Sequence, residues 1–169
     1  GKIDIIDRRD AVVYAAVVKA YINSNKLEGA IKFYRRIIDT YGTQSATLRD
    51  TVILKGFVQG MIERSQLPEA LGWAEGLEYT ARNTAMSNIA TLAADKGDRL
   101  TAATAFSNLS PDDHSVATPA MALLALCVRE GDVAAASQYW QILSTPDMLV
   151  TSAFIEPTAM YTLPLSDRD

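Results

Sequence analysis

The sequence predicts an all-α fold, a short α-solenoid of about four helix-turn-helix repeats. Apolar residues recur at helical spacing through most of residues 11–146. In addition, each predicted second helix carries one alanine at a matching place, and these alanines are 40, 32 and 34 residues apart. Three of them are followed four positions later by an aromatic residue, which fills the groove beside a close helix contact. The alanines are Ala30, Ala70, Ala102 and Ala136. A near-constant period of this length is typical of stacked helical hairpins.

The first hairpin, residues 11–42, has the clearest pattern. Its first helix has an apolar stripe made by Tyr14, Val17, Val18, Tyr21 and Ile22. The polar run at 23–26 interrupts the stripe, because Asn and Ser favour turns over helix interiors. The same periodicity then restarts at Leu27 and continues to Tyr41. A short turn between two amphipathic helices makes them pack antiparallel and leaves one apolar flank for the next hairpin.

Three further helix pairs follow. The second pair is predicted at 48–62 and 67–77, with Pro68 in the first turn of a helix, where its missing N–H costs nothing. The third pair is shorter, with helices at 86–93 and 100–109 separated by Gly97 and the expected N-cap Asp98. The fourth pair is predicted at 121–128 and 133–143, with Gly131 and Asp132 between them.

Two terminal segments lie outside the predicted repeats. Residues 1–10 are expected to form an N-terminal arm or the end of a preceding helix. Residues 147–169 fit no complete repeat and are too apolar for a solvated tail, with Phe154 and Tyr161 among their large side chains. Because the ends of a solenoid need covering, this segment is expected to cap the last repeat or to contact another chain.

Composition limits the classes of function. The 169 residues fit one domain, with 49% hydrophobic and 21% charged residues, and no apolar run is long enough to span a membrane. The formal charge of −4 divides into +2 for residues 1–85 and −6 for residues 86–169. The acidic second half is therefore a poor surface for nucleic acid. A single cysteine, Cys127, excludes an internal disulfide framework and a Cys-cluster metal site, and it agrees with a reducing compartment.

The sequence has no pattern typical of catalysis, and we expect no cofactor and no metal. His114, the single histidine, stands beside Asp112 and Asp113. These residues are either a metal or acid/base site or a solvated loop whose carboxylates face a helix N-terminus, and the second interpretation is favoured. Cys127 falls on an apolar helix face with no basic neighbour in the sequence to lower its pKa, so we expect a small hydrophobe there.

Partner-binding candidates are basic or aromatic. The residues Lys32, Arg35 and Arg36 form a basic group that is either a contact for phosphate or an acidic partner or a solvated helix face. The aromatic residues Trp73, Trp140 and Tyr139 are either interface anchors or, as is more usual at helical spacing, core residues. Of these, Trp140 is expected in the core and Tyr139 is expected to be more exposed. The full candidate set is Arg8, Arg9, Lys19, Lys32, Arg35, Arg36, Lys55, Tyr139, Phe154 and Tyr161.

The repeats resemble two related families. VVYAAVVKAYINSNKLEGAIKFYRRI and ILKGFVQGMIERSQLPEALGWAEGL resemble pentatricopeptide repeats, and AADKGDRLTAATAFSNLSP and CVREGDVAAASQYWQILSTP resemble tetratricopeptide repeats. Both resemblances imply a right-handed α-solenoid. The pentatricopeptide resemblance also implies a mitochondrial or plastid protein that binds single-stranded RNA, one base per repeat.

The positions that would read bases do not suit that task. By the resemblance they are Ala15, Lys55, Met121 and one of Ser87 or Asn88. Side chains of Ala and Met cannot hydrogen-bond a base edge. The sequence therefore favours a non-catalytic scaffold or assembly subunit that binds protein partners. The alternative is an organellar RNA-binding pentatricopeptide protein, and a third interpretation is an accessory domain of an enzyme.

Overall fold

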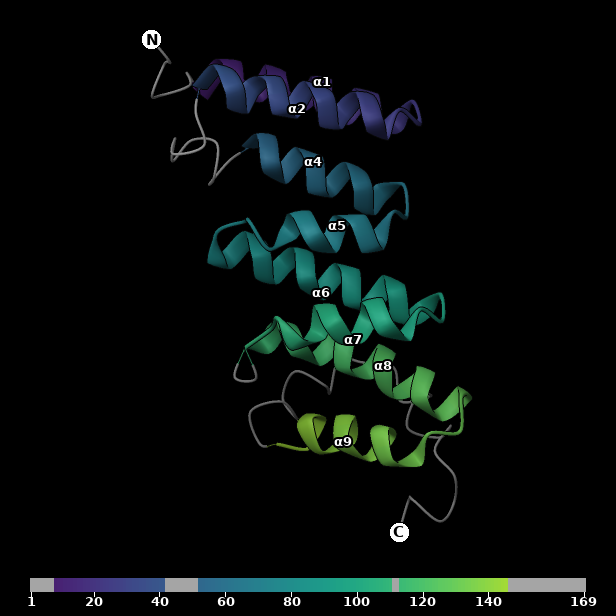
Figure 1. Cartoon of the computed structure of the whole chain (residues 1–169). Coiled ribbons are helices and arrows are strands. Elements are labelled where there is room, and N and C mark those ends of the chain that lie inside the picture. Colours follow the sequence, from purple (N-terminus) through teal and green to yellow (C-terminus); the bar gives the residue numbers. More distant parts are fainter. Residues whose placement is uncertain (1–7, 42–51, 111–112, 146–169) are drawn as a thin grey trace. The chain divides into compact units, whose positions relative to one another are not determined.

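The computed structural model describes residues 8–41, 52–110 and 113–145, and within these ranges the regular structure is entirely helical (Figure 1). The elements are α1 (Arg8–Asn23), α2 (Leu27–Tyr41), α4 (Val52–Glu63), α5 (Leu67–Ala74), α6 (Tyr79–Asp95), α7 (Arg99–Ser107), the 3-10 helix η1 (His114–Val116), α8 (Ala117–Arg129) and α9 (Val133–Leu143). This succession of helices and short turns confirms the predicted all-α, solenoid-like repeat. None of the described helices is both long enough and apolar enough to cross a bilayer.

The four hairpin turns share one backbone geometry. Each contains a residue with positive φ, five positions before the repeated alanine; these residues are Asn25, Ser65, Gly97 and Gly131. The N–H of each donates to the carbonyl three residues back, and the N–H of the next residue donates to the carbonyl five residues back, over 2.8–3.1 Å. This pattern satisfies the last carbonyls of the first helix, as in a Schellman motif. The four turns are therefore structurally equivalent.

The repeated alanines occupy equivalent surroundings. Ala30, Ala70 and Ala102 are fully buried and Ala136 is 3% exposed. The N–H of each donates to the carbonyl of the residue that follows the positive-φ position, over 2.9–3.1 Å. The period predicted from these alanines is confirmed.

The chain divides within α6 into two compact units, residues 1–85 and residues 86–169. In the first unit, α1 packs against both α2 and α4 (Figure 1). Two glycines of α4 allow a close approach: a Cβ on Gly56 would lie 3.1 Å from the Cβ of Ala15, and a Cβ on Gly60 would lie 3.0 Å from the Cδ1 of Ile22. The second helices join the same core through an aromatic cluster of Tyr34, Phe57 and Trp73, whose ring centroids are 4.5–5.6 Å apart.

In the second unit, α8 packs against α7, α9 and η1. Its core holds the fully buried Met86, Ile89, Leu123 and Leu124. Asp98 caps α7 by accepting a hydrogen bond from the N–H of Thr101 over 3.2 Å, as the sequence predicts. Asp132 caps α9 in the same way.

Several expected boundaries differ from the structure. α1 begins at Arg8, three residues before the expected start of the repeats at residue 11. α6 begins at Tyr79, well before the expected start at residue 86, so the first helix of the third pair is not short. α8 begins at Ala117, four residues early, and follows the 3-10 turn. The expected start of the second pair at residue 48 lies outside the described residues.

Candidate partner-binding surface

Exposed side chains of α4, together with two side chains at matching positions of α1, form a stripe on the first helices of the first unit. On α4, exposed residues recur every three or four positions, which places them on one side of the helix. The 40-residue register of the first two repeats aligns Val12 of α1 with Val52 of α4, and Lys19 with Gln59. We define the first-helix stripe as Val12, Lys19, Val52, Lys55, Gln59 and Glu63.

The stripe combines exposed apolar and charged groups. Val12 is 53% exposed and Val52 is 37% exposed. The Nζ of Lys19 lies 3.8 Å from the Oε1 of Glu63, an ion pair that joins α1 to α4. Both side chains remain partly in solvent, and such pairs contribute at most about 1 kcal/mol. They can therefore exchange this contact for one with a ligand at little cost.

The first helices of the second unit expose small, apolar and charged side chains, among them Leu92, which is 37% exposed, Asp95 and Arg129. Thr118 of α8 is exposed, and Ala122 and Ala125 follow it half-buried on the same side. On α6, Thr91 donates its hydroxyl to the carbonyl of Ser87 over 2.8 Å, and Ser87 donates to the carbonyl of Ser115 over 3.0 Å. These two hydroxyl groups are therefore used within the unit.

The basic group of α2 lies on a second helix and not on the first-helix stripe. Lys32, Arg35 and Arg36 are all exposed. The Nζ of Lys32 lies 3.6 Å from the Oε1 of Glu28, four residues earlier on the same helix. Lys19 and Lys55 belong to the stripe, so the structure separates the predicted basic residues by helix.

The remaining predicted residues divide into described and undescribed ones. Tyr139 is half-buried, and its ring packs edge-on against Phe106 with centroids 5.4 Å apart. Burial also raises the pKa of Tyr139. Trp140, expected in the core, is half-buried as well. Arg8 and Arg9 lie in the first turn of α1, but their side chains are outside the described residues, as are Phe154 and Tyr161.

The two residues that the sequence offers for chemistry, His114 and Cys127, lie in a capped turn and in the apolar core, respectively. His114 is exposed at the start of η1, and Asp113 caps that turn by accepting from the N–H of Ser115 over 2.8 Å. In the described ranges, no three His, Cys, Asp or Glu side chains gather closely enough to hold a metal. Cys127 is fully buried, and burial raises the pKa of its thiol.

The sequence-based expectation of no basic neighbour for Cys127 is wrong. Arg99, 28 positions earlier in the chain, acts on the thiol and lowers its pKa, but desolvation outweighs it. The thiol therefore stays protonated and packs as a small hydrophobe.

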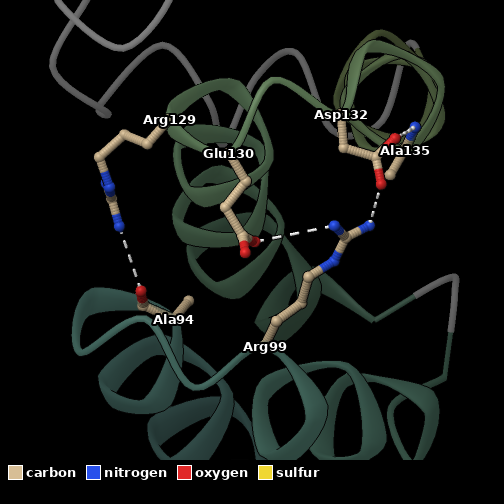
Figure 2. Close-up of polar contacts among 6 residues, drawn as sticks. All are labelled: Ala94, Arg99, Arg129, Glu130, Asp132 and Ala135. Atoms are coloured by element: carbon tan, nitrogen blue, oxygen red, sulfur yellow. Dashed lines mark hydrogen bonds and ion pairs between the residues drawn. The ribbon is translucent and has the colours of Figure 1, made fainter.

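Arg99 belongs to a polar network that sequence reasoning missed (Figure 2). Its guanidinium lies between two carboxylates, with Nη2 2.6 Å from the Oδ2 of Asp132 and Nη1 3.7 Å from the Oε1 of Glu130. A backbone hydrogen bond from Ala135 and the hydrogen bond from Arg99 hold the pKa of Asp132 below its ordinary value. Figure 2 also shows Arg129 reaching the carbonyl of Ala94, at 3.2 Å. These contacts join the third repeat to the fourth.

Part of this network has a signal in the sequence. Asp98 and Asp132 both follow a glycine at the start of a second helix, which identifies them as caps. The second contact of Asp132, to an arginine 33 positions earlier, depends on how successive hairpins stack. Single-helix patterns carry no information on that contact.

Comparison with known proteins agrees with the repeat geometry. The sequence profile of the tetratricopeptide repeat matches residues 47–145, more than half of the chain. No curated protein matches the chain, and neither does any solved structure. Tetratricopeptide repeats are in general non-catalytic modules for protein–protein interaction. Together with the four equivalent turns and the four equivalent alanines, this match identifies the chain as a member of the tetratricopeptide repeat family.

Proposed function

We propose that this chain is a non-catalytic scaffold or assembly subunit, which binds a protein partner through the first-helix stripe. The observation that carries the proposal is the exposure of Val12 and Val52 at matching positions of adjacent first helices. Exposed aliphatic side chains next to charged ones resemble the apolar centre and polar rim of protein interfaces. Burial of both valines would supply affinity, and the charged residues around them would supply specificity.

The charges of the stripe favour a partner of mixed charge. Lys55 is exposed, and the positive charge of Lys19 is offset by Glu63 at 3.8 Å. A nucleic acid requires a continuous positive face. The paired arrangement instead suits a protein surface with both signs.

The competing function is binding of single-stranded RNA by the pentatricopeptide mode. Two of the base-reading positions, Ala15 and Met121, are 6% and 8% exposed. Ala15 contacts Gly56 across the helix interface, so a base cannot reach it. The burial of these positions supports a protein partner over RNA.

Copurification from the native source tests this proposal. A tagged chain should recover a protein assembly that survives nuclease treatment. Lys55→Glu should weaken the recovery at least about tenfold by reversing a charge at the centre of the stripe. Lys32→Glu is the matched control, because it makes the same charge change on exposed α2.

Four results would count against the proposal. Loss of the assembly on nuclease treatment would favour RNA, and so would retention on single-stranded RNA that falls steeply with salt. Equal recovery with both variants would show that the stripe is not the contact surface. Loss with Lys32→Glu alone would place the contact on the basic group of α2.

A further inference from the structure

The first repeat shows which of its residues receive the next hairpin. Ala15 and Ile22 of α1 each lie against a glycine of α4, so closely that a Cβ on those glycines would come within 3.0–3.1 Å of them. On α2, the ring of Tyr34 lies 5.6 Å from that of Phe57 of α4. The three residues of the first repeat are at most 6% exposed. We call the residues at these three places the receiving side of a repeat.

The fourth repeat has an apolar receiving side as well. Counted from the repeated alanine of each repeat, its members are Met121 and Val128 of α8 and Trp140 of α9. Met121 is 8% exposed, and Val128 and Trp140 are half-buried. The described part of the chain ends at Thr145, just after α9, so it contains no helix that stands here as α4 stands in the first repeat. An apolar side at the end of stacked repeats needs a cover.

The residues that follow α9 have the composition of such a cover. Between residues 146 and 165 the sequence has nine large apolar side chains and two charged residues, Asp147 and Glu156. These residues do not fit a fifth first helix. When the 34-residue spacing of the last two repeated alanines is continued, Pro157 falls at the place of Phe57, in the middle of α4. Proline inside a helix removes a hydrogen bond and clashes with the preceding turn, so this segment is suited to cap the repeats and not to extend them.

We infer that residues 147–169 lie across the receiving side of the fourth repeat and cap it. The compact second unit, which holds α8 and α9, runs from residue 86 to residue 169 and so includes this segment. The segment is also long enough for the task. α8 has 13 residues and is therefore about 20 Å long, whereas the 23 residues of the segment reach roughly 75 Å when extended.

Attachment to α9 favours this segment over a separate occupant. α9 ends at Leu143, less than one turn after Trp140, and the N–H of Ser144 donates to the carbonyl of Trp140 over 2.9 Å. A segment joined at that point is present at the receiving side at a millimolar effective concentration, which a partner protein or a second copy at micromolar concentration does not reach. The cap goes beyond the proposed function, because the first-helix stripe belongs to the first unit.

Photo-crosslinking within the full, isolated chain tests the cap. The variant Phe154→p-benzoylphenylalanine places a photoreactive ketone in the apolar part of the segment, where it inserts into C–H bonds of the side chains that it touches. An equal mixture of isotope-labelled and unlabelled chains lets mass spectrometry separate crosslinks within one chain from crosslinks between copies. We expect crosslinks within one chain, to the peptides that hold Met121, Val128 or Trp140.

Two matched substitutions in the photoreactive chain locate the contact. Val128→Glu should lower the crosslink yield at least about fivefold, because the cap would bury an unpaired carboxylate. Val133→Glu makes the same change at a 42% exposed position, next to the residue that contacts Arg99 of the third repeat, and should leave the yield unchanged. Circular dichroism checks that both variants fold. The crosslinks of the chain without either substitution already locate the segment, so a fold defect in Val128→Glu leaves the test intact.

Three outcomes would overturn the inference. The first is the absence of crosslinks to α8 and α9 in the isolated chain, which would leave the receiving side to a separate protein. The second is crosslinks that join only labelled to unlabelled chains, since the cover would then come from a second copy. The third is an equal yield with Val128→Glu and Val133→Glu, which would show that the segment contacts another side of the unit.

Discussion

The hairpin turns share one hydrogen-bond pattern but differ in sequence, so substitutions at the positive-φ position should change the stability of the fold by measurable amounts. Ser65 adopts a φ of 59°, whereas Gly97, at the equivalent place, has a φ of 82°. A side chain with a Cβ in the left-handed region costs roughly 1–2 kcal/mol, and glycine avoids that cost. Ser65→Gly should therefore stabilise the fold, and Gly97→Ser should destabilise it.

The expected magnitude follows from two opposing effects. The greater freedom of glycine in the unfolded chain removes about 0.4–1 kcal/mol of the gain. The net change should be about 0.5–1 kcal/mol in the free energy of unfolding, positive for Ser65→Gly and negative for Gly97→Ser. Steric overlap with other residues adds nothing at Gly97, because no atom beyond its two chain neighbours lies within 4 Å of an added Cβ. Asn25→Gly should change less, since asparagine tolerates this conformation better than serine.

Urea unfolding followed by circular dichroism measures these changes. The midpoint should rise for Ser65→Gly and fall for Gly97→Ser, with the slope unchanged because the buried surface is unchanged. The reasoning is refuted if Ser65→Gly lowers the midpoint, or if Gly97→Ser leaves it where it was. Either result would mean that the four turns are not equivalent.

Three further predictions concern helix packing, the ion pair and the thiol. Gly56→Val should lower the free energy of unfolding by about 1–3 kcal/mol by overpacking α1 against α4. Gly72→Ala should raise the free energy of unfolding by about 0.5–1 kcal/mol, because alanine favours the helix and no other side chain lies within 4 Å of the new Cβ. Thermal unfolding of both variants measures these changes. A Gly56→Val variant as stable as wild type would contradict the close approach of α1 and α4. The pKa of Asp132 is depressed by the hydrogen bond from the backbone N–H of Ala135 and by Arg99. These two contacts therefore stabilise the folded state above the unfolded pKa of about 3.9, and that stabilisation is lost as the pH falls through the folded pKa. The difference in urea midpoint between wild type and Arg99→Met should therefore shrink below about pH 4, and a constant difference down to pH 2 would be inconsistent with this ion pair. Burial raises the pKa of Cys127, so a thiol reagent at pH 8 should react slowly with the native chain and rapidly in urea; rapid native labelling would contradict the burial.

The repeat period was predictable because alanine occupies the same buried position in all four second helices. Where two helices approach most closely, only a small side chain fits, and the alanines mark that place in each second helix. The caps at Asp98 and Asp132 were also predictable, since each is a short acceptor placed directly before a helix.

The start of α6 was not predictable from the same patterns. Its first two turns lack a large apolar stripe, and its first turn is capped by Glu78, which accepts from the N–H of Ala81 over 3.2 Å. Glutamate is not among the usual N-cap residues, so the boundary carries no standard signal.

The side-chain placement within α9 also escaped the sequence. Tyr139 and Trp140 are adjacent, and periodicity alone placed Trp140 inward and Tyr139 outward. In the structure both are half-buried, because the ring of Tyr139 packs on Phe106 of the neighbouring second helix. Contacts between hairpins decide such details, and periodicity within one helix does not report them.

Lysine footprinting of the chain, alone and bound to the assembly recovered with it, tests most directly whether this repeat protein binds a protein partner through its first helices. Lys55 on the first-helix stripe and Lys32 on α2 are both exposed in the free chain and should react equally with an acylating reagent. In the assembly, we predict that Lys55 becomes protected while Lys32 stays reactive. Protection of Lys32 with Lys55 still reactive, or protection that disappears with nuclease, would contradict the account.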